Sequence, residues 1–428
     1  GGNLVVTLET GDTDQTVTIS SISSATSASG TYTVQSGDAS SDLTVNSIAL
    51  SAGTLFDAAS NNMSSFSIPS GSNLADSEAF VIDGNVPTIS SVSLASDNST
   101  IAVTMSEAVY NTDGGSGSLE TTDFTFSISG GTATLSSSNP TSISISGNGY
   151  TLGIYLSGTP DGGETLTVSP AATTAIYDIA GNAAATSQSN NTATLNDQAV
   201  PTISSLTSST SDGTFKIGDE INITVSFSEA VTLSGGNLVI TLETGSTDQT
   251  VTISSISSAT SASGTYTVQS GDASSDLTVN SIALSAGTLF DAASNNMSSF
   301  SIPSGSNLAD SEAFVVDGIA PTISSVTSTT DDGTFKIGDE INVTVNFSEA
   351  VTLSDGNLVV TLETGDTDQT VTISSISSAT SASGTYTVQS GDASSDLTVS
   401  TIALSAGTLS DAASNNMSSF SIPSGSNL

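Results

Sequence analysis

The chain has 428 residues, among them 42 acidic and only two basic side chains, and carries a formal charge of −40. It contains no Cys, His or Trp. Two basic side chains cannot neutralise the phosphates of a nucleic acid, and an anionic membrane would repel so acidic a surface, so we expect neither nucleic-acid binding nor membrane insertion. Divalent cations are natural partners of unpaired carboxylates, but the charge could also serve only to keep a long chain soluble.

Short strands with an apolar residue at every second position are predicted in several parts of the chain. In chain order the clearest are residues 100–105 (TIAVTM), 123–128 (DFTFSI), 141–146 (TSISIS), 221–227 (INITVSF) and 341–347 (INVTVNF). In residues 221–227, Ile221, Ile223 and Val225 alternate with polar side chains, which is typical of a half-buried strand. No stretch shows the apolar stripe of an amphipathic helix. The pattern predicts an all-β fold.

The chain contains long internal repeats. The phrase NLVVTLETG begins at Asn3 and again at Asn357, and the variant NLVITLETG begins at Asn237. Prolines in equivalent phrases divide the chain into residues 1–86, 87–200, 201–320 and 321–428, of which the second is diverged. Residues 1–86 lack the counterpart of residues 201–234, and residues 321–428 stop at the counterpart of Leu308. We expect a window from a longer tandem array, with strand addition from neighbouring molecules as the alternative.

Each repeat has the size of an immunoglobulin-like (Ig-like) β-sandwich, with about seven short strands in roughly 115 residues. The link at residues 318–320 is short, and Pro321 fixes φ directly after it, which limits bending. We therefore expect tandem Ig-like sandwiches arranged as an elongated rod, in which the first lacks its N-terminal strands and the last lacks its final strand.

Several phrases in a fixed order point to a known group of proteins. DGTFKIGDEINVTVNFSEAVTL, YTVQSGDASSDLTV and VVDGIAPTISSVTS resemble the Ig-like tandem repeats of giant bacterial cell-surface adhesins and related exported repeat proteins. The likeness covers residues 1–86, 201–320 and 321–428 almost throughout, and residues 87–200 resemble a sister version. The resemblance implies a β-sandwich fold, a tandem stalk, export to the cell surface and, in many members, Ca²⁺ at the domain junctions.

Acidic residues recur at equivalent places in the repeats, and we take four sets of them as candidate metal ligands. The first set lies just before the junction proline: Asp83, Asp197 and Asp317. The second lies in the SEAV phrase, expected at the end of the second strand of a repeat: Glu107, Glu229 and Glu349. The third begins the DAASNN phrase or its relative DIAGN: Asp57, Asp178, Asp291 and Asp411. The fourth precedes the second strand: Asp219 and Asp339.

The spacing of these residues suggests a cation at the junctions. Ca²⁺ takes about six to eight oxygen ligands from carboxylates, carbonyls and water. Strand ends and loops of an antiparallel sandwich gather at its two poles, so the aspartate before the proline and the SEAV glutamate can meet where the next repeat begins. A Ca²⁺ ion there would stiffen the joint. The alternative is that the Asp-Gly pair only forms a turn at a strand end.

The composition bears on three classes of function. Without His or Cys, general acid–base and thiol catalysis lack their usual groups, and the abundant Ser has almost no activating base, so we expect no enzyme. We expect a structural extracellular or cell-surface segment, a stalk or filament that associates head to tail with copies of itself or adjoining repeats. The alternative is an adhesin module that binds a glycan or a host surface. Glycan decoration is possible at sequons such as those of Asn222 and Asn296.

Overall fold

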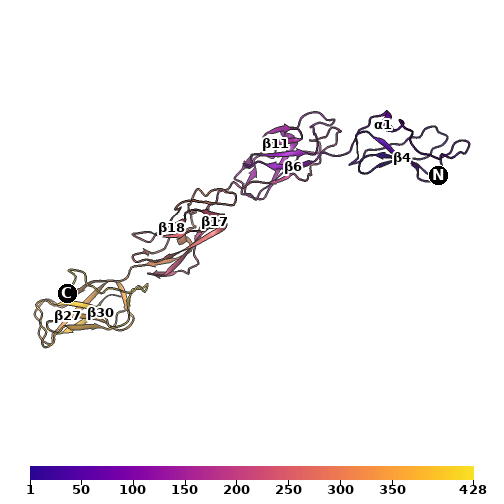
Figure 1. Ribbon diagram of the computed structural model, residues 1–428. Helices are drawn as coiled ribbons and strands as arrows, with labels where there is room; N and C mark the ends of the chain where they lie inside the picture. The colour runs from indigo at the N-terminus through magenta and orange to yellow at the C-terminus, as the bar shows by residue number, and fades with distance from the viewer. The chain divides into compact units, whose positions relative to one another are not determined.

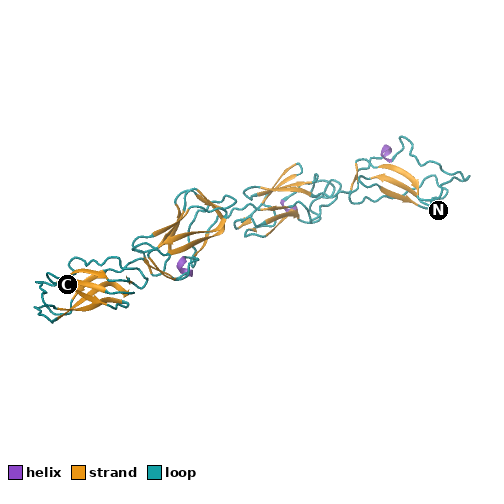
Figure 2. Ribbon diagram, turned by 60° about the horizontal axis from the view of Figure 1, so that its bottom comes forward, coloured by secondary structure: helices purple, strands orange, loops and turns teal.

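The computed structural model describes all 428 residues, and the chain divides into two compact units, residues 1–199 and 200–428. Strands dominate both units, and the helices are very short (Figures 1 and 2). Each unit contains two hydrophobic cores, and each core lies within one of the ranges that the prolines mark out. The structure thus consists of tandem β-sandwiches, as expected, while the residue boundaries of the four domains stay a prediction.

Residues 201–320 contain three sheets and show how a repeat folds. The sheet orders are β15-β17-β20, with β23 beside the C-terminal part of β17, then β19-β18-β22, and the small sheet β16-β24-β21. All pairs are antiparallel except β16 with β24, which are parallel. The bounds are β15 (Ile203–Thr207), β16 (Gly213–Lys216), β17 (Glu220–Ser234), β18 (Leu238–Leu242), β19 (Gln249–Ile253), β20 (Ala259–Thr267), β21 (Ala273–Ser274), β22 (Val279–Leu284), β23 (Thr288–Phe290), α2 (Leu308–Ser311) and β24 (Phe314–Asp317).

Alternating side chains pack the two larger sheets of this repeat face to face. Ile221, Ile223 and Val225 of β17 are fully buried, and Leu238 and Ile240 of β18 belong to the same core. Burying each such side chain contributes about 1.5–3 kcal/mol. The strand predicted at residues 221–227 is therefore confirmed, although β17 continues well beyond it.

A glycine sets how closely the two sheets approach each other. A Cβ atom on Gly264 of β20 would lie 2.4 Å from Val251 Cγ1 of β19, and one on Gly384 would lie 2.3 Å from Val371 Cγ1 in the next repeat. A side chain at either place would push the sheets apart, so only glycine fits this packing.

Residues 321–428 repeat this arrangement without the small sheet. The orders are β25-β26-β29, with β31 beside β26, and β28-β27-β30. The bounds are β25 (Ile323–Thr327), β26 (Glu340–Leu353), β27 (Leu358–Glu363), β28 (Gln369–Ile373), β29 (Ala379–Thr387), β30 (Thr398–Leu404) and β31 (Leu409–Ser410). Residues 333–336, the counterpart of β16, form no strand, because no counterpart of β24 lies beside them.

Residues 1–86 form a three-stranded sheet, β2-β1-β4, and a two-stranded one, β3-β5. The bounds are β1 (Leu4–Glu9), β2 (Gln15–Ile19), β3 (Ala39–Ser40), β4 (Thr44–Leu50), α1 (Leu74–Ser77) and β5 (Ile82–Asp83). Strands equivalent to β15, β16 and β17 are absent from these residues. Consequently Met63 is 50% exposed, whereas its counterpart Met297 is 6% exposed.

Residues 87–199 form a diverged sandwich. The sheet orders are β10-β11-β7-β6 and β14-β13-β8, with β9 paired to β12. The bounds are β6 (Ile89–Leu94), β7 (Thr100–Met105), the 3-10 helix η1 (Thr121–Asp123), β8 (Phe124–Ser129), β9 (Thr134–Leu135), β10 (Ile143–Ser146), β11 (Gly149–Gly153), β12 (Leu156–Ser157), β13 (Thr165–Pro170) and β14 (Thr192–Thr194). The strands predicted at residues 100–105 and 123–128 are confirmed, since Ile101, Val103, Phe124 and Phe126 are buried.

The two α-helices were not foreseen from the sequence. Each is one turn long and begins with a capping box, in which the side chains of Asn307 and Asp310, or of Asn73 and Asp76, bond each other's backbone. No helix in the structure has the length and apolar character needed to cross a bilayer.

A hydrogen-bonded aspartate anchors the YTVQSGD phrase in three of the repeats. In residues 321–428, the Tyr386 hydroxyl and the Gln389 backbone N–H donate to Asp392 Oδ2 at 2.5 and 2.6 Å, and Gln369 Nε2 donates to Oδ1 at 3.1 Å. Tyr266 and Asp272 form the equivalent bond at 2.6 Å, and Tyr32 bonds Asp38 in the same way. The hydrogen bond from Tyr386 holds the pKa of Asp392 below its ordinary value, and burial together with this bond raises the pKa of Tyr386 to about 12.

Replacing Tyr386 by Phe is expected to destabilise the C-terminal repeat at neutral pH. Because the pKa of Asp392 is lower in the folded than in the unfolded chain, its stabilising effect is complete above about pH 4 and is lost as the pH falls through the folded-state pKa. Calorimetry should show the melting temperature of Tyr386→Phe several degrees below that of the wild type at pH 7, with the gap narrowing below about pH 4.

Tyr155→Phe is the matched control, since Tyr155 is 64% exposed. It should melt like the wild type at every pH. A gap for Tyr386→Phe that stayed constant down to strongly acid pH would contradict the role given to Asp392.

Candidate metal centre

Three carboxylates meet wherever one repeat follows another within a unit. In the first unit the side chains are Asp83, Glu107 and Asp178, and each offers an oxygen such that these oxygens all lie within 4.8 Å of one another. Asp317, Glu349 and Asp411 form the same group in the second unit. One aspartate comes from the preceding repeat and the other two residues come from the following one. The structure thus brings together members of three of the predicted sets.

The first aspartate is placed by a strand end and a crowded glycine. Asp317 is the last residue of β24, and the N–H of Ile319 donates to its Oδ1 at 3.2 Å. A Cβ atom on Gly318 would lie 2.2 Å from the carbonyl oxygen of Gln269, so glycine is required at this position. The hydrogen bond from Ile319 gives Asp317 a role in the turn, and it engages only Oδ1, so Oδ2 could still bind a metal ion.

The glutamate is placed by an irregularity within a long strand. The pairing of β26 with β29 shifts register between Asn346 and Val351, and Glu349 lies in the shifted stretch. Such bulges re-aim side chains at sheet ends. The expectation that the SEAV glutamate closes the second strand is wrong for Glu229 and Glu349, because β17 and β26 continue past them. It is closer for Glu107, which follows the end of β7 at Met105.

The third carboxylate is buried in a tight loop. Asp411 is 6% exposed and accepts hydrogen bonds from the backbone N–H and the Nδ2 of Asn415, at 2.8 and 2.9 Å. Ser414 has φ of 73°, a left-handed conformation that lets the loop turn back. In the first unit Asp178 is fully buried, Asn182 makes the same two bonds, and Gly181 takes the left-handed position.

The same asparagine ties consecutive repeats together. Asn415 Nδ2 also donates to the carbonyl oxygen of Asp317 at 2.8 Å, and its Oδ1 accepts from the N–H of Ile217 at 2.9 Å. In the first unit, Asn182 Nδ2 donates to the carbonyl oxygen of Asp83 at 2.9 Å. Sequence reasoning missed this role. The signal was the Asn that follows the loop aspartate four residues later in both DAASNN and DIAGN.

The clusters carry unneutralised negative charge. Burial, followed by repulsion from Asp411 and Asp317, raises the pKa of Glu349 above its ordinary value. Glu107 has its pKa raised by burial and by repulsion from Asp178 and Asp83. The single salt bridge of the chain joins Lys336 to Asp339 at 2.9 Å, outside these groups. A bound cation would remove the repulsion that the chain itself does not relieve.

The donor set fits a hard cation. All three side chains offer oxygen, and the chain contains neither His nor Cys for a softer metal. The acidic clusters could therefore hold a divalent metal ion.

The remaining predicted ligands fall into two groups. Asp197 belongs to the first unit, where its Oδ1 accepts from the N–H of Ala199 at 2.8 Å. Glu229 and Asp291 belong to the second unit, where Asp291 is buried and bonds Asn295 as Asp411 bonds Asn415. Three others accept hydrogen bonds within turns: Asp57 from Ala59 and Asn61, Asp219 from the N–H of Lys216, and Asp339 from Lys336.

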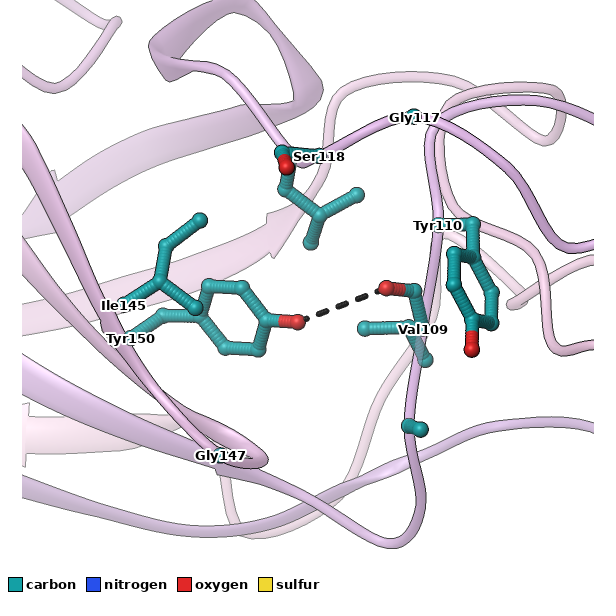
Figure 3. Close-up of a pocket in the computed structure, with 9 residues that line it drawn as sticks. Val109, Tyr110, Gly117, Ser118, Ile145, Gly147 and Tyr150 are labelled. Carbon is teal, nitrogen blue, oxygen red and sulfur yellow. Dashed lines mark hydrogen bonds between the residues drawn. The ribbon is translucent and has the colours of Figure 1, made fainter.

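A small pocket lies in the second repeat. It has a volume of about 210 Å³ and is lined by Tyr110, Ser118, Ile145 and Tyr150, among others (Figure 3). The buried Tyr150 hydroxyl points to the carbonyl oxygen of Val109 at 3.5 Å, which is at the limit of a hydrogen bond. The pocket therefore combines aromatic walls with a weakly engaged donor.

No protein-family profile and no curated protein match the chain. Among solved structures it is similar to the FN1–FN3 domains of chicken CNTN1, with 11% identity over 77% of this chain and 95% of that one, and a TM-score of 0.25. It is also similar to the full extracellular region of plexin A4, with 10% identity over 93% of this chain and a TM-score of 0.16. The match spans 33% of that plexin chain. The fold assignment rests on the strand pairing described above.

Replacing Glu349 by Gln is expected to stabilise the protein when metal is absent. The substitution keeps the shape of the side chain and removes one of three mutually repelling charges. In chelator, Glu349→Gln should melt at a higher temperature than the wild type. Glu363→Gln, an exposed position outside the clusters, changes the net charge equally and should leave the melting temperature nearly unchanged. Equal melting of the two variants would mean that Glu349 experiences no local repulsion.

Proposed function

We propose that the chain is a structural segment of an extracellular or cell-surface protein, in which tandem Ig-like domains supply length and Ca²⁺ at the junctions stiffens the joints. The observation that carries the proposal is the carboxylate triad that recurs between consecutive repeats, in two places within the compact units. A triad that draws ligands from both sides of a joint links the stiffness of that joint to cation binding.

Calcium suits these triads better than other common divalent ions. Ca²⁺ accepts flexible coordination by about six to eight oxygens, whereas Mg²⁺ demands a near-ideal octahedron. Three carboxylates can supply several of these oxygens, and water can complete the shell. Extracellular EF-hand modules bind Ca²⁺ in the range of about 10⁻⁴–10⁻³ M, and we expect the triads to bind the ion in a similar range. By sequence equivalence we extend the proposal to Asp197, Glu229 and Asp291.

The resemblance to the repeats of giant bacterial adhesins supports a stalk on a bacterial surface. Near-identical repeats also favour spacing over recognition, because a recognition site gains little from duplication of its whole scaffold. The alternative is a glycan-binding adhesin module. The observation that favours it is the pocket lined by Tyr110 and Tyr150 in the diverged repeat, where Tyr110 is a partly exposed aromatic side chain.

Self-association forms the second part of the proposal. Phe80 is 47% exposed, whereas its counterpart Phe314 is fully buried and stacks edge-on against Phe215 at 5.4 Å. Phe335, the counterpart of Phe215, makes no aromatic contact, and its segment has no strand partner. In this part of the proposal, the β5 segment of another copy, or the equivalent segment of an adjoining repeat of the same chain, pairs with residues 333–336. Strand addition of this kind would join copies head to tail.

Calcium should stabilise the protein and restrict the bending between the two repeats of the second unit. Because the chain has no Cys, spin labels on Thr265→Cys and Thr385→Cys report the distance between exposed, equivalent sites of two consecutive repeats. Pulsed electron paramagnetic resonance should give a narrower distance distribution in Ca²⁺ than in chelator. At about 100 times the dissociation constant, each occupied site should add about 2.7 kcal/mol to the free energy of unfolding.

Glu349→Gln in the same labelled chain should abolish the narrowing and remove one site from a calorimetric Ca²⁺ titration, while Glu363→Gln should retain both effects. Absence of binding heat, together with equal distribution widths in Ca²⁺ and chelator, would overturn the calcium part of the proposal.

Head-to-tail association should depend on two aromatic positions. Sedimentation velocity of the wild type should show a weight-average mass that rises with concentration. Phe80→Ser and Phe335→Ser should each stay monomeric, because each lacks one side of the contact. A mixture of the two variants should form a 1:1 dimer and nothing larger, since each variant retains one working side.

Phe56→Ser serves as the control for non-specific hydrophobic association. Phe56 is 61% exposed, and its counterpart in the C-terminal repeat is Ser410. It should associate like the wild type. A monomeric wild type, or a mixture without dimers, would exclude this mode of association.

A further inference from the structure

Asparagines of the sequon Asn-X-Ser/Thr differ sharply in their surroundings. Eight positions have X other than Pro: Asn62, Asn98, Asn190, Asn222, Asn296, Asn342, Asn346 and Asn416. Only two of them, Asn222 and Asn342, also have an acidic residue two positions earlier, Glu220 and Glu340 respectively. These two occupy equivalent places at the start of β17 and β26.

In each of these two strands, the acidic residue and the Asn and Thr of the sequon lie on the same face. Successive side chains of a strand point to opposite faces, so Glu220, Asn222 and Thr224 share the outer face while Ile221 and Ile223 are buried beneath them. An extended chain with this sequence therefore presents an acid, an amide and a hydroxyl in a row. A transferase that binds an extended acceptor can contact all three at once.

The amide nitrogens of this pair are free. The Thr224 hydroxyl donates to Asn222 Oδ1 at 3.0 Å, and the Thr344 hydroxyl donates to Asn342 Oδ1 at 2.8 Å. Neither Nδ2 donates a hydrogen bond, and no buried side-chain nitrogen of the chain lacks a partner, so both Nδ2 atoms contact solvent. A substituent on Nδ2 would break no bond of the folded protein.

Two other sequons lack this freedom. Asn98 is 3% exposed, and its Nδ2 donates to the carbonyl oxygen of Asn196 at 2.8 Å. Asn346 lies four residues after Asn342 in β26, and its Nδ2 donates to the hydroxyls of Ser325 and Thr327 at 2.9 and 3.1 Å. Substitution there would cost these hydrogen bonds.

The residues beside Asn222 on the outer face are small and polar. Its direct neighbour on β20 is Thr265, and the adjacent β15–β16 loop presents Ser208 and Thr210, whose hydroxyls bond the backbone of Asn222. Small polar side chains of this kind leave the space above the sheet open, and they can bond sugar hydroxyls.

We propose that Asn222 and Asn342 are N-glycosylation sites, modified by an oligosaccharyltransferase that requires the acidic residue two positions before the asparagine. Nδ2 attacks the anomeric carbon of a lipid-pyrophosphate-linked oligosaccharide and forms the C–N bond. The bond from that carbon to the pyrophosphate oxygen breaks, the lipid pyrophosphate leaves with the electron pair, and the amide proton passes to a base of the transferase. Because both sites lie in central strands, attachment precedes folding. The proposal rests on the export proposed above and is independent of Ca²⁺ binding.

The test is to export the full chain to a bacterial periplasm together with an acid-requiring oligosaccharyltransferase and its lipid-linked donor, and to measure intact mass and glycopeptides. Two glycans are expected. Asn222→Gln and Asn342→Gln should each remove one, and Glu220→Gln should remove most of the glycan at Asn222 while leaving Asn342 occupied. Asn346→Gln and Asn296→Gln should leave the mass of attached glycan unchanged.

Two further measurements keep the result interpretable. The glycosylated and unmodified proteins should melt at nearly the same temperature, since no hydrogen bond is lost. A peptide of residues 217–228 should also be glycosylated by the same transferase. Modification of the peptide without the chain, modification of neither, or preferential glycan at Asn296 or Asn416 would each overturn the proposal. Loss of the calcium effects alone would leave it standing.

Discussion

Within each compact unit, the joint between the two repeats holds three carboxylates whose oxygens lie within 4.8 Å of one another, and their mutual repulsion is the interaction on which the joint depends. Burial strengthens this repulsion, and the chain has almost no basic side chains to offset it. A protein that keeps such a cluster at a joint either tolerates a weakened joint or binds a cation there. If a cation binds, it relieves the repulsion, and the stiffness of the joint then depends on the cation concentration.

Hydrogen bonds also connect the two repeats at the joint of each unit. Asn182 and Asn415 each bind the loop aspartate of their own repeat and the last strand of the preceding one. These hydrogen bonds hold the carboxylates in place in the protein itself. Under the proposed Ca²⁺ binding, such a preformed site would lower the entropy lost when the ion binds.

The diverged second repeat keeps the acidic residues of the joint, although the packing of its core differs from that of the other repeats. Its core contains a Phe124–Tyr150 contact at 5.8 Å, and it has Gly181 where the last repeat has Ser414. Yet it contributes Glu107 and Asp178 to a triad with the same composition as that of Glu349 and Asp411. Core packing tolerates many apolar solutions of similar volume, whereas three oxygen ligands must converge on one point.

Much of the fold followed from local patterns in the sequence. Period-two alternation located strands such as β7 and β17, because burial on one face of a sheet is a property of neighbouring residues. The repeated phrases located the joint aspartates, because an aspartate stands just before the proline in each of them. The tertiary structure decided which acids meet: Asp83, Glu107 and Asp178 converge, while Asp57, Asp219 and Asp339 serve turns. It also showed that the SEAV glutamates of β17 and β26 lie inside long strands, and that Asn222 and Asn342 keep a free amide nitrogen. Those facts depend on contacts between residues far apart in the chain, which no local pattern encodes.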